Sequence, residues 1–158
     1  MTIRKYRESD REALKQISVS CFGGVSIDHG IEKLCGPIAG KDWTWRKTQQ
    51  IEDDINKYPN GIFVAEADGT VVGFITTRVD HAKGMGSIPD LAVLPAQRRK
   101  GIASKLVYTA VQHLKKEGME YVRIDTLDQN EICKHFYPKR GFKEIAKVIH
   151  YIMQIDDT

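Results

Sequence analysis

The chain has 158 residues, of which 41% are hydrophobic and 28% charged, and its formal net charge is +3 at pH 7. This is the composition of a soluble globular protein, and we expect a single domain over residues 1–158 that buries a proper core. Because no apolar run reaches the length of a membrane span and the positive charge is small, we expect a cytoplasmic protein that binds neither membranes nor nucleic acid.

The three cysteines, Cys21, Cys35 and Cys133, are far apart and odd in number, which argues against a disulfide framework. No cysteine has the paired spacing of a zinc ligand, and the five histidines are scattered. We therefore expect no metal.

Helices and strands are predicted to alternate along the chain. In order, the expected elements are a strand over 2–7, helices over 10–21 and 43–57, strands over 62–67 and 70–80, a strand over 90–93, a helix from about 101, a strand over 121–127, a helix from 130, and one or two strands within 142–155. Ser9 and Glu12 have the spacing of a capping box for the first helix. Asp68-Gly69 is a strong hairpin signal. Residues 22–41 are Gly-rich and only weakly periodic, and no element is predicted there.

The segment from Asp90 to Ala103 is an apolar strand, a basic turn and the start of an amphipathic helix. The first N–H groups of such a helix have no partner within it, so those of Ile102 and Ala103 can bind phosphate oxygens. Gly101 has no Cβ to keep a phosphate away from the main chain. The turn also carries three cationic side chains, namely Arg98, Arg99 and Lys100. The sequence therefore predicts a site for a phosphorylated ligand.

A second motif follows the strand at 121–127, and with it the chain resembles the GNAT superfamily of acyl-CoA-dependent N-acyltransferases. The family's first signature is matched by Arg98, Gly101 and Ala103. Its second signature combines an asparagine at a helix start, a tyrosine two turns later and a Gly-Phe pair. It is matched by Asn130, Tyr137, Gly141 and Phe142. The resemblance is good from about residue 61 to residue 142.

The resemblance implies an α/β fold with a mixed, mostly antiparallel central sheet, helices flanking it, and two strands that splay apart at the cofactor cleft. The pantetheine arm of acetyl-CoA would lie between the strands at 90–94 and 121–127, and the backbone groups of Leu91 and Val93 would pair with its amides. Asn130 would bond the CoA arm, cap its own helix, or do both.

The resemblance also implies a catalytic acid, Tyr137, which would protonate the departing thiolate. The base stays open between Asp125 and Asp90, with an ordered water in between. Many relatives carry a second acid beside the position of Asp90, whereas this chain has Pro89 there. Cys133 is expected to pack in its helix, so no acyl-enzyme intermediate is expected.

The expected function is therefore direct transfer of an acetyl group from acetyl-CoA to a primary amine of a small molecule or a protein, within a ternary complex. A CoA-binding sensor domain without turnover is the alternative. In this family the segments equivalent to residues 22–45 and 81–86 shape the acceptor pocket, and they do not identify the acceptor here. A homodimer is compatible with the sequence.

Overall fold

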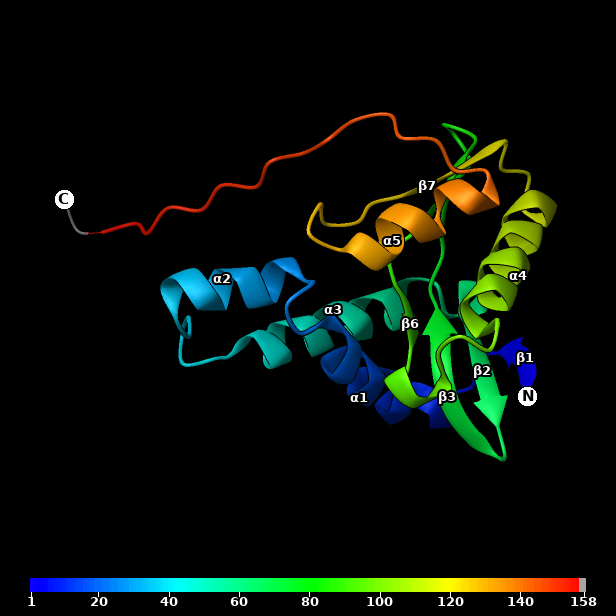
Figure 1. Ribbon diagram of the computed structural model, residues 1–158, viewed down its shortest axis with the longest axis horizontal. Coiled ribbons are helices and arrows are strands. Elements are labelled where there is room, and N and C mark those ends of the chain that lie inside the picture. The colour runs from blue at the N-terminus through cyan, green and yellow to red at the C-terminus, as the bar shows by residue number, and fades with distance from the viewer. Residues whose placement is uncertain (157–158) are drawn as a thin grey trace.

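The computed structural model describes residues 1–156, which form two small sheets surrounded by helices (Figure 1). The strands are β1 (Thr2–Lys5), β2 (Phe63–Ala67), β3 (Thr70–Ile75), β4 (Arg78–Asp80), β5 (Met85–Ile88), β6 (Leu91–Val93) and β7 (Tyr121–Ile124). The α-helices are α1 (Arg11–Phe22), α2 (Ile27–Cys35), α3 (Trp43–Lys57), α4 (Ile102–Lys116) and α5 (Glu131–Phe136). Short 3₁₀ helices lie at Glu8–Asp10, Pro59–Gly61, Pro95–Gln97 and Pro138–Arg140.

The first sheet has the order β1-β2-β3-β6 and is antiparallel throughout, and the second has the order β4-β5-β7. Among the strands of residues 1–156, only β5 and β7 run parallel. The predicted mixed, mostly antiparallel sheet flanked by helices is therefore confirmed. The predicted strand over 70–80 is divided, because the chain leaves the first sheet at Thr76 and joins the second at Arg78.

Two apolar clusters hold the helices to the first sheet. The apolar residues of α4 recur at a spacing of three and four, so one face of the helix is buried. That face packs in one cluster with β2, β3 and β6; the buried members are Phe63, Ala65, Val72, Ile75, Ile88, Val93, Ile102, Leu106, Val107 and Ala110. The second cluster joins α1 and α3 to the same strands and contains Leu14, Ile17, Ile51, Ile55, Ile62, Val64, Phe74 and Ala92.

The division into two sheets opens a gap between β6 and the chain that follows β7. The parallel pairing of β5 with β7 ends at Ile88 and Ile124. Beyond that point β6 pairs with β3, and residues 125–156 join no sheet. The predicted splaying of these strands is confirmed, with the second strand ending at Ile124 instead of Leu127.

The N-terminal capping prediction was wrong. Ser9 lies inside a helical turn that begins at Glu8, and no side chain caps α1. The Asp10 carboxylate instead accepts a bond from the Arg7 N–H at 2.8 Å, before that turn. The same Asp10 carboxylate also accepts two bonds from the Arg4 guanidinium, which hold it beside the Arg7 N–H.

Two further segments differ from their predictions. Helix α2 lies where no element was predicted, and Ser26 caps it by accepting a bond from the His29 N–H at 3.1 Å. The strands predicted within 142–155 are absent from the described chain, where residues 142–156 have no regular secondary structure. A strand needs a hydrogen-bonded neighbour, and this segment runs away from the rest of the chain (Figure 1). Within residues 1–156, none of the helices has both the length and the apolar character needed to cross a bilayer.

Candidate functional site

The open edge of β6 presents main-chain groups to the gap. The Asp90 carbonyl accepts a bond from the Thr76 N–H, and the Leu94 N–H donates to the Val72 carbonyl, each with an N···O distance of 2.9 Å. The main-chain groups of Asp90 and Leu94 therefore face β3. Successive residues of a strand point their polar groups to opposite edges. The main-chain groups of Leu91 and Val93 therefore face the gap, on the side where the sequence expects the pantetheine arm.

The turn after β6 leads into an uncapped helix N-terminus. Gly101 is the N-cap of α4, has φ of +78° and makes no side-chain cap, so the first N–H groups of α4 are left for another partner. A Cβ built on Gly101 meets no atom within 4 Å, so the space in front of the helix is open. Arg98 supports the turn by donating from Nε to the Val93 carbonyl at 3.0 Å.

A further cation lies at this helix start. Arg140, in the 3₁₀ helix after α5, hydrogen-bonds through Nη2 to the Ser104 hydroxyl in the first turn of α4. Its guanidinium also stacks on the Phe136 ring at 3.4 Å and donates to the Phe136 carbonyl at 2.7 Å. These contacts join the segment that carries Tyr137 to the N-terminus of α4, and they bring a fourth cationic side chain to the three predicted ones.

Helix α5 begins as predicted. The Asn130 side-chain oxygen accepts a bond from Cys133 N–H at 3.3 Å and caps the helix, which confirms the capping role. Burial raises the pKa of the Cys133 thiol, which disfavours the thiolate needed for a nucleophile.

Tyr137 has a buried ring and an unbonded hydroxyl. Its side chain is 7% exposed and lies edge-on to Phe136 and Phe142, with ring centroids 5.1 and 5.4 Å away. The hydroxyl bonds no other residue among 1–156, and it is not among the buried polar atoms that are sealed without a partner. Burial, followed by the negative charges of Cys133 and Asp90, raises the pKa of Tyr137 above its usual value. The phenol is therefore protonated at neutral pH.

Asp90 is buried in a polar network that joins β6 to α3. Lys47 Nζ lies 2.6 Å from one carboxylate oxygen, and Gln50 Nε2 donates to the other at 2.8 Å. Both Lys47 and Asp90 are 4% exposed. Burial raises the pKa of Asp90 to about 6, while the Lys47 charge opposes the rise.

The structure separates the two carboxylates proposed as the base. Asp90 is buried at the start of β6, where its carboxylate pairs with Lys47 of α3. Asp125 is 88% exposed and lies 3.6 Å from the Arg123 guanidinium, beyond the end of β7.

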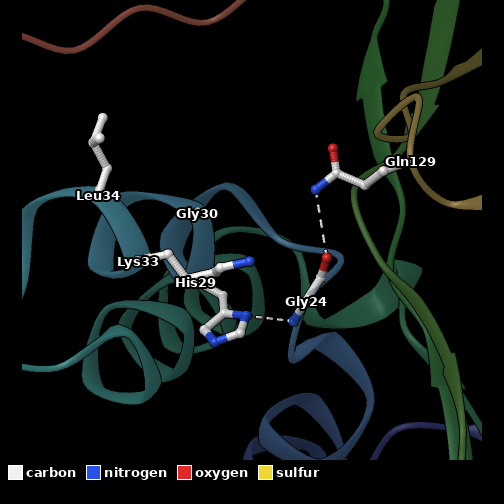
Figure 2. Close-up of a pocket in the computed structure, with 6 residues that line it drawn as sticks. All are labelled: Gly24, His29, Gly30, Lys33, Leu34 and Gln129. Carbon is white, nitrogen blue, oxygen red and sulfur yellow. Dashed lines mark hydrogen bonds between the residues drawn. The ribbon is translucent and has the colours of Figure 1, made fainter.

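An open pocket of about 300 Å³ lies between α2, the turn before it and the loop before α5. The His29 ring accepts a bond from Gly24 N–H at 2.5 Å, and Gln129 donates to the Gly24 carbonyl at 3.4 Å (Figure 2). Lys33 and Leu34 complete one wall. Five of its six lining residues belong to the segment 22–45 that the sequence associated with the acceptor. The other such segment, 81–86, lies elsewhere, because Gly84 accepts main-chain bonds from Glu120 and Tyr121 at the start of β7.

Sequence reasoning missed Lys47 and Gln50. A signal was present, because the buried positions of α3 are 47, 51, 54 and 55, which share one helical face. A lysine on a buried face implies a paired acid, and Asp90 is that acid.

Comparison with known proteins supports the same family. Residues 28–142 match the sequence profile of the acetyltransferase (GNAT) family. A relative from Sulfurisphaera tokodaii, an N-alpha-acetyltransferase, is 30% identical over 117 residues, which cover 67% of this chain and 70% of that protein. An aminoglycoside N(6')-acetyltransferase type 1 from Salmonella typhimurium is 31% identical over 96 residues, covering 56% of this chain and 66% of that one.

A solved structure shows the same fold. The crystal structure of the PaiA N-acetyltransferase of Thermoplasma acidophilum, determined in complex with coenzyme A, superposes with a TM-score of 0.72 at 24% identity. The match covers 90% of this chain and 89% of that one. Together with the divided sheet and the uncapped start of α4, these matches show that the chain belongs to the GNAT family of acetyltransferases.

Proposed function

We propose that this acetyltransferase transfers the acetyl group directly from acetyl-CoA to a primary amine, with Tyr137 as general acid. The observation that carries the proposal is the hydroxyl of Tyr137. It sits on a buried ring and remains unbonded within the described chain, next to the gap between β6 and β7. Because the hydroxyl is accessible and has no protein partner, it is available to a ligand atom.

The residues present fit a diphosphate and a pantetheine arm. The uncapped N–H groups at the start of α4, the open space at Gly101 and the positive charge of Arg98, Arg99 and Lys100 suit the diphosphate. The cleft-facing main-chain groups of Leu91 and the N–H of Val93 suit the amide-bearing arm, whereas the Val93 carbonyl already accepts a bond from Arg98. The Asn130 side chain adds a polar group at the start of α5. Arg140 adds charge at the same helix start.

Acetyl-CoA supplies the acetyl group as a thioester. The neutral amine attacks the carbonyl carbon, so that a C–N bond forms and the C–S bond breaks. Tyr137 donates its proton to the departing sulfur, and the proton lost by the amine passes through water to Asp90. Asp90 is a better acceptor than Asp125 because burial raises its pKa to about 6, whereas Asp125 lies in solvent.

We place the amine acceptor beside the pocket formed by α2 and the loop before α5. Its class stays open between small molecules and proteins, since one relative is named for N-alpha-acetylation and another for aminoglycosides. A panel of peptides, polyamines and amino sugars, assayed with acetyl-CoA by release of free thiol, tests the proposal. Thiol release without an amine measures hydrolysis and serves as the blank. If the protein binds CoA but no amine raises thiol release above the blank, it is a CoA-binding domain without turnover.

Substitution of Gly101 by valine should weaken CoA binding at least about tenfold. A β-branched residue is strained at φ of +78°, and its side chain would enter the space in front of α4. Isothermal titration calorimetry with CoA measures the loss. Gly118→Val is the matched control, because Gly118 has φ of +85° and open space but follows the other end of the same helix. Equal losses of CoA affinity in Gly101→Val and Gly118→Val would contradict a phosphate site at Gly101.

The pH dependence of kcat should show an acidic limb near pH 6. The ionised form of Asp90, which accepts the proton, predominates only above its pKa of about 6, so the rate should fall as the pH drops through this value. Two active acceptors should be compared, a peptide α-amine with a pKa of about 8 and a lysine-type amine with a pKa of about 10.4. The limb should stay near pH 6 with both, whereas a limb that moves with the acceptor would exclude Asp90 as its source.

A further inference from the structure

A second buried carboxylate, that of Asp54, lies beside the polar network of Asp90. Asp54 is 4% exposed, and its Oδ1 atom pairs with the Arg78 guanidinium of β4. The other oxygen, Oδ2, is sealed from solvent and has no hydrogen-bond donor within residues 1–156. A buried carboxylate oxygen without a donor is costly, so the cluster around Asp54 requires a further proton donor.

Helix α3 places Asp54 on the face that holds Asp90. Lys47, Gln50 and Asp54 are separated by three and four positions, and residues at this spacing lie above one another on one side of a helix. Lys47 and Gln50 both bond the Asp90 carboxylate, at 2.6 and 2.8 Å. Asp54 is therefore the next side chain along the row that contacts Asp90.

The contact between the two carboxyls is a hydrogen bond. Burial is the largest cause of the raised pKa of Asp90, the Lys47 charge opposes it, and the charge of Asp54 and a side-chain hydrogen bond with Asp54 raise the pKa further. Two ionised carboxylates offer only acceptors, so a hydrogen bond between them needs a proton on one of the two. A proton held by this pair is suited to supply the donor that the Asp54 carboxylate otherwise lacks.

We propose that Asp54 and Asp90 share one proton and act as a single acid–base group, in which Asp54 is a positioning residue. Lys47 pairs with one carboxylate and Arg78 with the other, so two positive charges match the two negative ones. Because adjacent carboxylates repel each other, such a pair binds a proton more tightly than either group alone. The use of the pair in acetyl transfer rests on the function proposed above, whereas the shared proton does not.

The other charged and titratable groups that face the pair come from three elements. The cations are Lys47 on α3 and Arg78 on β4, and the arginine is ionised throughout. The end of α5 adds Tyr137, whose pKa is raised chiefly by burial, so its phenol stays protonated over the pH range in which the pair titrates. A titration step near pH 6 in this cluster therefore belongs to the two carboxyls.

Carbon-13 NMR of the full chain, labelled at the aspartate Cγ atoms, measures the shared proton and needs no acceptor amine. In the wild type the Cγ signals of Asp54 and Asp90 should move together over a step near pH 6. Asp54→Asn keeps the shape of the side chain and removes its charge, so the Asp90 step should fall by about one pH unit, a tenfold weaker hold on the proton. Asp53→Asn is the matched control, because it removes an exposed charge one residue away on the same helix, and the step should stay in place.

The variant Arg78→Met tests the pair in the opposite direction. It removes the cation that pairs with Asp54, so the shared step should rise instead of falling. The Arg78 side chain is 42% exposed, so this variant gives a test that does not depend on the folding of Asp54→Asn.

Separate titration steps for the two Cγ signals in the wild type would overturn the shared proton. An Asp90 step that is unchanged in Asp54→Asn would overturn it as well. The acidic limb of kcat then tests the positioning role, because it should follow the NMR step in each variant. A limb that stays near pH 6 in Asp54→Asn while the NMR step falls would exclude Asp90 as the proton acceptor, and with it the role of Asp54, but would leave the shared proton intact.

Discussion

Replacement of Tyr137 by phenylalanine is expected to lower kcat roughly 10²- to 10⁴-fold, the usual contribution of a general acid. The change removes the hydroxyl and keeps the ring that packs between Phe136 and Phe142. Because that hydroxyl makes no bond within residues 1–156, its removal should leave the fold and the affinity for CoA nearly unchanged. Steady-state kinetics and calorimetry with CoA measure the two quantities separately.

A second tyrosine provides the control for this experiment. The half-buried Tyr58 has a hydroxyl that bonds the His113 ring at 2.8 Å, in the last turn of α4 and so at the opposite end of that helix from Gly101. Tyr58→Phe should cost stability and leave kcat unchanged. If Tyr137→Phe loses CoA affinity and kcat by the same factor, the residue supports the binding site and is not the acid.

Since the pKa of Tyr137 is raised, the wild-type rate should also show no basic limb from this residue below pH 10.

The parts of the site that the sequence predicted are those set by local patterns. The turn before α4 and the cap of α5 each depend on a few consecutive residues, such as Gly101 and Asn130, and both are found where they were predicted. The boundaries of α3 follow from its periodicity and from Pro59 after it. In each case the residues that determine the local structure lie within one or two turns of one another.

The parts that were missed depend on contacts between distant segments. Helix α2 is short, has Gly30 in its middle and no fully buried residue, and it is held by its packing on α3. The Lys47–Asp90 pair joins residues 43 positions apart. The sequence of residues 142–155 predicts one or two strands, but the segment has no strand neighbour within residues 1–156. Pairing of this kind depends on tertiary or quaternary contacts that a single sequence does not display.

The burial of Asp90 also changes how its role is understood. In sequence, Asp90 and Asp125 were equal candidates because both precede a motif on a splayed strand. In the structure the buried Asp90 carboxylate accepts bonds from two side chains, whereas the Asp125 side chain is 88% exposed. Burial makes Asp90 important for folding as well as for the proposed proton transfer, so the two roles need to be measured separately.

Breaking the Lys47–Asp90 pair is expected to cost about 3–5 kcal/mol in the free energy of unfolding. Either Lys47→Ala or Asp90→Ala leaves the opposite charge in a site where both partners are 4% exposed. Lys47 would keep the Gln50 oxygen at 2.9 Å and the Phe22 ring, and neither carries a full negative charge. Urea denaturation of each single variant at pH 7.5 measures the loss.

The double variant Lys47→Met/Asp90→Leu separates stability from chemistry. Apolar side chains of similar volume remove both charges together, and such replacements of buried pairs are often neutral or stabilising. We expect its free energy of unfolding to return to within about 1 kcal/mol of the wild type, while its kcat stays low because the proton acceptor is gone. A double variant that regains stability and full kcat would show that Asp90 serves the fold alone. Single variants as stable as the wild type would show that water reaches the pair and that it is not a buried one.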